Sequence, residues 1–289
     1  MKRFLFLLVS ISLIVISCSD SSAAPTLTRA PAQTAVPVPT TQSTPTAAPQ
    51  PQSRSLVVLA ASSLAEVFPE IGAIYRRKYP SDTLSFSFAS SPVLRTQIEQ
   101  GAKADIFASA DDIQMNAAVK SGVIEGTPTL FVKNKLVVII PKNTPGKISK
   151  LQDLSKPGLK LVLTGPEVPV GNYARQSIAK MALDSSFGPD FSNATLKNLV
   201  SNETNVRVVV AKVVLGDADL GFCYLSDVTA ATAPQVTVIP IPDQFNVIAT
   251  YYVGVVKGSK NPDAAKALID TITSEQGKQV LKKYNFNTD

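Results

Sequence analysis

From Leu56 onward the chain alternates short apolar runs with amphipathic stretches, and this alternation restricts its fold more than any other feature of the sequence. The runs LVVLA at 56–60 and LVVII at 136–140 have the length and β-branched content of buried strands, whereas the apolar residues of 64–75 recur at helical spacing. Strands that alternate with helices predict an α/β fold with a mostly parallel sheet. The same criteria predict further strands at 84–89, 105–109, 159–163, 220–223 and 251–256, and further helices at 92–100, 113–121, 171–182 and 261–284.

The segment VRVVVAKVVL at 206–215 satisfies two patterns at once. Its many β-branched residues favour a strand. Its valines are also spaced so that they fit one face of a helix. The residue pattern alone therefore leaves both structures open for this segment.

The first residues have the pattern of an export signal. Lys2 and Arg3 precede an apolar run at 4–16, which is typical of a secretory signal peptide over residues 1–17 and is short for a membrane span. The sequence Val-Ile-Ser-Cys that ends at Cys18 resembles the lipobox of bacterial lipoproteins, which implies cleavage before Cys18 and lipidation of its thiol. An ordinary signal peptide with an incidental cysteine is the alternative.

The stretch that follows is rich in Pro, Thr, Ala, Ser and Gln and has almost no large apolar side chain. Such a composition cannot bury enough apolar surface to order itself, so we expect residues 18–54 to be a lipidated cysteine and a disordered linker. The chain is therefore predicted to be exported and lipid-anchored, on the outer face of the cell membrane or in the periplasm.

The composition excludes several kinds of site. The chain has no histidine and only two cysteines, which rules out Ser-His-Asp and Cys-His catalysis, imidazole metal sites and a structural zinc site. Cys223 lies in the apolar context LGFCYLSD and is expected to pack as a small buried hydrophobe without a disulfide. The net charge of +6 is scattered along the sequence, so nucleic-acid binding is not supported.

Hydroxyl groups recur where a predicted strand is followed by a helix. Ser62 and Ser63 follow the first strand, and Ser63 with Glu66 also fits the S-x-x-E pattern of a helix capping box. Ser90 and Ser91 follow a later strand, just before a proline suited to the first turn of a helix. The loops at 165–174 and 202–207 precede two more predicted helix starts, the second only if 206–215 is helical.

These loops predict a site for a small oxyanion. In an open α/β fold the carboxyl ends of the strands border one crevice, where helix N-termini offer unpaired N–H groups and the positive end of a dipole. Such donors suit a fully ionised oxyanion and need no lysine or arginine. Hydrogen phosphate carries a proton that must itself be donated, so an all-donor site disfavours it, whereas sulfate, molybdate and tungstate present only acceptors.

Five motifs carry a specific resemblance, namely LAASSLAEVF, FSFASSPVLRTQIEQGAKADIFASAD, NKLVVIIPK, GPEVPVGNYARQSI and LGFCYLSD. In this order they resemble the bacterial periplasmic molybdate-binding proteins of ABC uptake systems, over roughly residues 55–286. The resemblance implies a two-lobed periplasmic binding protein of type II, with two crossover strands and a ligand cleft between the lobes. Lobe I would comprise 55–133 plus 251–289, and lobe II 134–250. Residues 206–215 would be helical.

The resemblance also implies which residues bind the ligand. Hydroxyl donors would be Ser63, Ser91 and Tyr224, and backbone N–H donors would be Val170 and Val206; Ser62 could share or take the role of Ser63. The protein would capture molybdate, and tungstate as well, and deliver it to the transmembrane subunits of an ABC permease. It would be a monomer with no catalytic residue, no cofactor and no direct metal ligand.

Three other functions are weighed against this one. The first is a receptor for another tetrahedral oxyanion such as sulfate. The second is a serine acyl-enzyme, because Ser177 and Lys180 form an S-x-x-K motif, although the companion motifs Ser-Asp-Asn and Lys-Thr-Gly are absent. The third is a surface sensor or adhesion module that keeps the fold without binding oxyanions.

Overall fold

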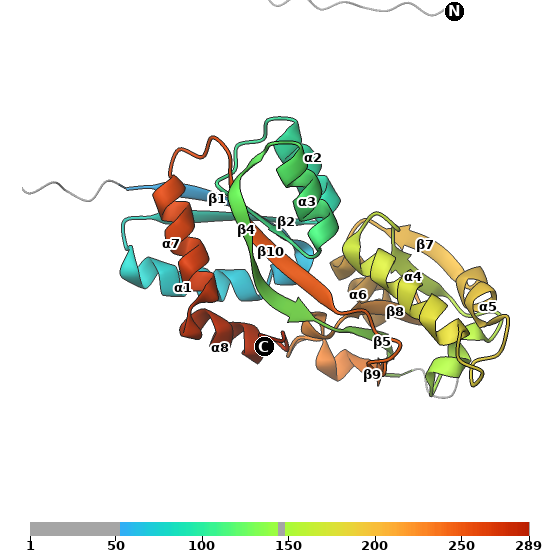
Figure 1. Ribbon diagram of the computed structural model, residues 1–289. Helices are drawn as coiled ribbons and strands as arrows, with labels where there is room; N and C mark the ends of the chain where they lie inside the picture. The colour runs from blue at the N-terminus through green and yellow to red at the C-terminus, as the bar shows by residue number, and fades with distance from the viewer. Residues whose placement is uncertain (1–52, 144–147, 289) are drawn as a thin grey trace, which may run out of the picture. The chain divides into compact units, whose positions relative to one another are not determined.

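The computed structural model describes residues 53–143 and 148–288, which fold into two lobes, each built on a five-stranded sheet (Figure 1). The predicted signal peptide, Cys18 and almost all of the predicted linker lie outside the described residues. The predicted α/β class is confirmed, since helices alternate with the strands of both sheets. The prediction of a mostly parallel sheet is wrong, because β10 in the first sheet and β5 in the second run antiparallel to both of their neighbours.

The first sheet has the strand order β2-β1-β3-β10-β4, in which β1 pairs in parallel with β2 and β3, and β10 runs antiparallel to β3 and β4. Its strands are β1 (Ser55–Ala61), β2 (Thr83–Ala89), β3 (Ile106–Ser109), β4 (Ile124–Asn134) and β10 (Ala249–Val256). The helices of this lobe are α1 (Val67–Lys78), α2 (Ser91–Glu99), α3 (Asp112–Lys120), α7 (Pro262–Thr273) and α8 (Glu275–Lys283), with the short 3-10 helix η1 (Ser62–Leu64) after β1.

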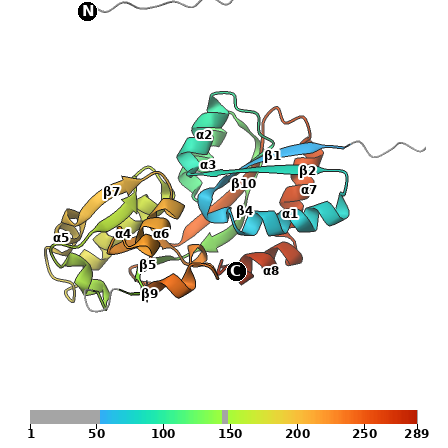
Figure 2. The same cartoon turned by 180° about the vertical axis from the view of Figure 1, so that it is seen from behind.

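The side chains of β1 alternate between two buried clusters, which explains why helices cover both faces of this sheet. Leu56 and Val58 belong to one buried cluster, which includes apolar residues of α1, α7 and α8. Leu59 lies in a second cluster with residues of α2 and α3. Successive side chains of a strand point to opposite faces, so each face has its own core. The view from behind in Figure 2 shows α1 alongside β1 and β2, apart from α2 and α3.

The second sheet has the order β7-β6-β8-β5-β9. Its strands are β5 (Leu136–Pro141), β6 (Leu161–Thr164), β7 (Leu199–Glu203), β8 (Leu220–Tyr224) and β9 (Val236–Pro240). The helices of this lobe are α4 (Pro169–Ala182), α5 (Phe191–Lys197) and α6 (Val206–Leu215), and the 3-10 segments are η2 (Leu151–Ser155), η3 (Leu225–Asp227) and η4 (Ala233–Gln235). Helices α4 and α6 both pack against β6, β8 and β5.

The chain passes between the lobes twice. β4 ends at Asn134 and β5 begins at Leu136, so the first passage is almost continuous strand. The second passage leads from β9 to β10, whose first residue Ala249 pairs with Asn134. Asn134 and the start of β10 therefore lie side by side where the lobes join, and Figure 1 shows the end of β4 next to the start of β10 there.

The segment 206–215, which the residue pattern left open, is a helix as the resemblance implies. The Asn205 side chain accepts a hydrogen bond from Arg207 N at its start, and Gly216 ends it in the left-handed conformation. Other predicted elements need correction. The predicted helix 261–284 is two helices, separated at Ser274, whose hydroxyl accepts from Gly277 N. Strands β4, β7 and β9 and helix α5 were not predicted from the sequence, since their residues carry weak or mixed periodicity.

Two smaller observations complete the fold. Cys223 is a free cysteine with no exposed surface, and burial raises the pKa of its thiol, as expected for a small hydrophobic side chain. Within 53–143 and 148–288, none of the helices has both the length and the apolar character that a membrane span requires.

Candidate anion-binding site

A small cavity lies where the two lobes meet. Three segments of each lobe line it, and all of these lining residues are uncharged: Ala61, Ser62, Ser63, Ala89, Ser90, Ser91 and Ala110 from the first lobe, and Val168, Pro169, Val170, Val206 and Tyr224 from the second. Its volume is about 10 Å³, close to what a single water molecule needs. The structure therefore brings all five predicted ligand-binding residues, and Ser62, around one small cavity.

Helices begin on several sides of this cavity. Ser91 is the first residue of α2, Val206 is the first of α6, and Val170 is the second of α4. The N–H groups in the first turn of a helix have no acceptor within the helix and carry the positive end of its dipole. Both lobes thus direct backbone donors toward the same space.

Ser63 does not form the capping box that its spacing from Glu66 predicts. The Ser63 hydroxyl lies 2.9 Å from the Tyr251 hydroxyl, and no side chain caps the start of α1. Glu66 instead accepts a hydrogen bond at 2.9 Å from the guanidinium of Arg207 on the other lobe. The hydroxyl of Ser63 is consequently available at the cavity wall rather than engaged in stabilising a helix.

Ser91 also has a defined partner inside the protein. Its Oγ accepts a hydrogen bond from the backbone N–H of Ala110 at 3.1 Å. Because this interaction uses the oxygen as an acceptor, the single hydroxyl hydrogen of Ser91 stays available as a donor. Among the described residues, the side chains of Ser62 and Ser90 make no hydrogen bond, although both line the cavity.

The Tyr224 hydroxyl is the clearest indication that the cavity binds a polar ligand. Its hydroxyl is buried and has no hydrogen-bond partner among the described residues, although the ring packs edge-on against Tyr251 at 5.7 Å between centroids. A buried hydroxyl without a partner costs about 1–3 kcal/mol. Burial also raises the pKa of the Tyr224 phenol, so the group stays protonated and can donate.

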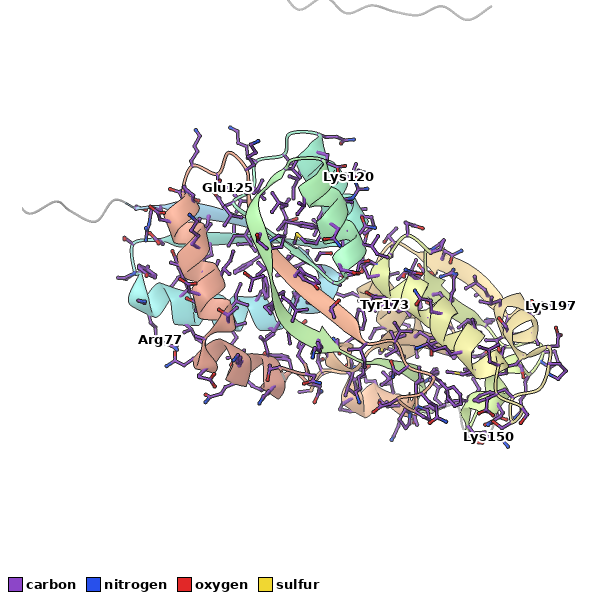
Figure 3. The ribbon with its side chains drawn as sticks, in the orientation of Figure 1. Arg77, Lys120, Glu125, Lys150, Tyr173 and Lys197 are labelled. Carbon is purple, nitrogen blue, oxygen red and sulfur yellow. The ribbon has the colours of Figure 1, made fainter. Side chains whose placement is uncertain are left out.

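Two buried carboxyl groups lie close to lining residues, and the cation Arg207, which follows the lining residue Val206, is paired with Glu66. Burial raises the pKa of Asp111, next to the lining residue Ala110, to about 6. It raises the pKa of Asp227 to about 7, although this carboxylate accepts a hydrogen bond from Tyr224 N at 2.9 Å. Figure 3 shows Tyr173 where the lobes meet and Arg77, Lys150 and Lys197 on outer faces. The site therefore relies on neutral donors.

Two residues that the sequence did not single out belong to this site. Tyr251 has no exposed surface, and its hydroxyl is bonded to that of Ser63. Asn134 is buried beside it, with 3.5 Å between Asn134 Nδ2 and the Tyr251 hydroxyl. Neither lies in a strand-to-helix loop, so the loop pattern could not identify them, and their strands contain other polar residues from which they do not stand out.

The S-x-x-K motif does not form an exposed nucleophilic site. Ser177 has no exposed surface, and its hydroxyl has no hydrogen-bond partner within the described part of the chain. Lys180 donates instead to the backbone carbonyl of Asn246 at 2.7 Å. In the described ranges, no group of three or more Asp, Glu, Cys or His side chains is arranged to hold a metal ion.

Comparison with known sequences identifies a protein family that this chain matches. A model described as bacterial extracellular solute-binding protein matches residues 56–287. The molybdate-binding protein ModA of Mycobacterium tuberculosis is 36% identical over 81% of this chain and 85% of its own length, and that of Escherichia coli is 32% identical over 80% and 88%. A Bacillus subtilis protein named putative ABC transporter substrate-binding lipoprotein YvgL is 28% identical over 81% and 87%.

Solved structures agree with this match. The substrate-binding domain of a putative molybdenum ABC transporter from Clostridium difficile has 30% identity and a TM-score of 0.61, covering 82% of this chain and 99% of that one. The periplasmic molybdate-binding protein of Azotobacter vinelandii, at 18% identity and a TM-score of 0.70 over 80% and 98%, shows the same two-lobed fold of type II periplasmic binding proteins. The relatives named above are binding proteins rather than enzymes. This chain belongs to the bacterial extracellular solute-binding protein family.

Proposed function

We propose that this protein is the solute-binding component of an ABC importer and that it captures molybdate, and tungstate as well, for delivery to the permease. The observation that carries the proposal is the convergence of the Ser63, Ser91 and Tyr224 hydroxyls on a cavity with no charged lining residue. The names of the relatives support the choice of molybdate, since proteins so named share about a third of the sequence over most of the chain.

The proposed mechanism of recognition uses neutral hydrogen atoms. Removing a dianion from water is unfavourable unless every oxygen is hydrogen-bonded, and hydrogen bonds to charged groups are worth about 1.5–3 kcal/mol each. The three hydroxyls, with the N–H groups of Val170 and Val206, would supply several such bonds. The two N–H groups cannot accept, and the Ser91 oxygen already accepts from Ala110 N, so an oxyanion that carries a proton finds few acceptors and hydrogen phosphate would bind poorly.

Contacts between the lobes suggest how capture would be stabilised. Arg207 on α6 pairs with Glu66 at the start of α1, and the Gln114 side chain lies 3.4 Å from the carbonyl of Glu167 on the other lobe. Both contacts form only when the lobes are together. A ligand bonded to donors from both lobes would favour a closed state over an open one, with the lobes slightly farther apart than here, because an oxyanion is larger than the water-sized cavity.

We further propose the domain organisation and location of the chain. Residues 1–17 would be a signal peptide, and residues 18–54 a linker anchored by lipid at Cys18. Lobe I would comprise 55–133 plus 251–289, and lobe II 134–250. The chain would act as a monomer outside the cytoplasm, which fits a family of extracellular proteins and a relative named as a lipoprotein.

Calorimetric titration of the protein with molybdate, tungstate, sulfate and phosphate at equal concentrations tests the proposed ligand. Molybdate and tungstate should bind with a stoichiometry of one, and phosphate should bind far more weakly. Preference for sulfate would replace the proposed ligand. A folded protein that binds none of the oxyanions would refute the function and leave a sensor or adhesion module.

Replacing Ser91 with alanine should weaken molybdate binding by about 1–3 kcal/mol, because one donor to a buried charge is lost. Titration calorimetry measures the change directly. Ser177→Ala is the matched control: this serine is equally buried, has no hydrogen-bond partner among the described residues and does not line the cavity. Equal affinity in Ser91→Ala and the unaltered protein would show that Ser91 does not contact the ligand.

A further inference from the structure

A buried chain of polar side chains reaches the anion site from the point where the lobes join. Tyr251 at the start of β10 is bonded to Ser63 at 2.9 Å between hydroxyl oxygens. Asn134 at the end of β4 lies 3.5 Å from the Tyr251 hydroxyl through its Nδ2, which also donates to Ser226 at 2.8 Å. All four residues are buried. Within a low-dielectric interior, the direction of each hydrogen bond in such a chain is constrained.

The orientation of the Asn134 amide is fixed by its neighbour. The backbone N–H of Lys135 donates to Asn134 Oδ1 at 2.9 Å, which requires the oxygen on that side and places the amide hydrogens toward Tyr251 and Ser226. Asn134 can therefore only donate to the Tyr251 hydroxyl. Burial raises the pKa of the Tyr251 phenol, so its own hydrogen is present and needs an acceptor.

Only one direction of the Ser63–Tyr251 bond satisfies every buried group. Among the described residues, the Ser63 oxygen is the sole acceptor available to the Tyr251 hydrogen. If Ser63 donated instead, the Tyr251 hydrogen would be left buried without a partner, which is unfavourable. Tyr251 must therefore donate, and the single hydrogen of Ser63 is left to point elsewhere, with the cavity that Ser63 lines as the open side.

We infer that Tyr251 is a positioning residue that holds the Ser63 hydroxyl as a donor toward the oxyanion, and that Asn134 fixes Tyr251 in this role. The inference rests on the proposed function, since it needs an anion in the cavity. It also assigns a part of the specificity. Accepting from Tyr251 uses one of the two lone pairs of the Ser63 oxygen and turns its hydrogen toward the ligand, which makes Ser63 a weaker acceptor for a protonated ligand, so Tyr251 helps to disfavour hydrogen phosphate.

Tyr251→Phe tests this inference, because it removes one hydroxyl and keeps the ring that packs against Phe131, Tyr224 and Phe286. Molybdate binding should weaken about tenfold. Binding of phosphate at pH 8, where it is mainly hydrogen phosphate, should weaken less or strengthen, so that the ratio of the two affinities narrows. A residue with a purely structural role would weaken both ligands equally.

A double-mutant cycle tests whether Tyr251 acts through Ser63. In a Ser63→Ala background, Tyr251→Phe should change the Kd for molybdate less than twofold, because the hydroxyl that Tyr251 positions is absent. Tyr75→Phe is the matched control: it removes a hydroxyl that is equally buried in the same lobe but bonded to Asp82 at 2.6 Å, so it should lower the Tm and leave the Kd unchanged.

The outcomes separate the inference from the function on which it rests. Additive effects of Tyr251→Phe and Ser63→Ala, or an unchanged ratio of molybdate to phosphate affinity, would overturn the role of Tyr251 while the protein still binds molybdate. An unaltered protein that binds no oxyanion would overturn both. Loss of affinity in Tyr75→Phe as large as in Tyr251→Phe would show that the effect follows lobe stability rather than the orientation of Ser63.

Discussion

Gly171→Ala should weaken molybdate binding by about a hundredfold or more, the largest effect expected from a single methyl group in this chain. Gly171 is the third residue of α4, directly after the proposed donor Val170. A Cβ at this position would lie 2.3 Å from the carbonyl oxygen of Gly165 and 2.5 Å from that of Thr164. Both obstacles are backbone atoms of a strand end and its loop, so the start of the helix must move away.

The movement of α4 would remove its N–H groups from the cavity, because Val168, Pro169 and Val170 form one wall of it. Overpacking of this kind also lowers the free energy of unfolding, by about 1–3 kcal/mol. Thermal unfolding and calorimetric titration of the same sample separate the two effects. The expected signature is a loss of affinity that persists at temperatures where circular dichroism shows the variant to be folded.

Gly277→Ala is the matched control for this substitution. Its Cβ would lie 2.3 Å from the carbonyl oxygen of Ile272 and 2.4 Å from that of Thr271, an equally severe clash at the start of α8. No residue of α8 lines the cavity. The control should lose stability and keep its affinity. Equal losses of affinity in the two variants would mean that the close approach of α4 to Thr164 has no special role in the site.

The strands and helices that the sequence predicts correctly are those in which one pattern dominates. The run at 136–140 is apolar throughout because β5 is paired on both sides, with β8 and β9, and all of its residues are buried. β4 was not predicted because it lies at the edge of its sheet. It contains the mostly polar stretch EGTPTL, and its side chains do not alternate regularly between exposed and buried. The conflict at 206–215 could not be resolved from periodicity: the family resemblance implied a helix, and Asn205 and Gly216 are residue types typical of helix termini.

The proposed site was predictable to a similar degree. Loops that precede helix starts can be recognised locally, as at Ser63 and Ser91, whereas Tyr224 was implied only by the resemblance; the structure places all three around one cavity. What the sequence could not provide is the partner of each hydroxyl. Tyr251 is 188 residues from Ser63, and a contact across that separation depends on the fold. The predicted capping box at Ser63 was wrong for the same reason, because Arg207 of the other lobe pairs with Glu66.

Binding should weaken by about tenfold per pH unit above pH 7, and Asp227→Asn should remove most of this dependence. Burial raises the pKa of Asp227 from an ordinary value of 3.8 to about 7, so the folded protein holds a proton that the unfolded chain releases near pH 4. A dianion beside Tyr224 would raise the pKa further, since two negative charges in a buried site repel. Above pH 7, binding must therefore take up a proton that becomes scarcer as the pH rises.

The raised pKa of Asp227 also determines how the stability of the protein changes with pH. Between pH 4 and 7 the folded state binds more protons at Asp227 than the unfolded state, so the contribution of this group falls as the pH rises and is lost above pH 7. Asparagine resembles the protonated form and can still accept from Tyr224 N. The Tm of Asp227→Asn should thus match that of the unaltered protein near pH 4 and exceed it at pH 8.

Asp243→Asn removes the same charge from the same lobe, but its side chain is 76% exposed and paired with Lys135, so both pH profiles should stay as they are in the unaltered protein. Titrations in buffers of different ionisation enthalpy count the protons taken up, and nearly one is expected at pH 8. Because Arg207 is the cation that favours ionised Asp227, Arg207→Gln should move the onset of the decline to higher pH. A flat affinity from pH 6 to 9 in the unaltered protein would show that the carboxyl does not interact with the bound anion.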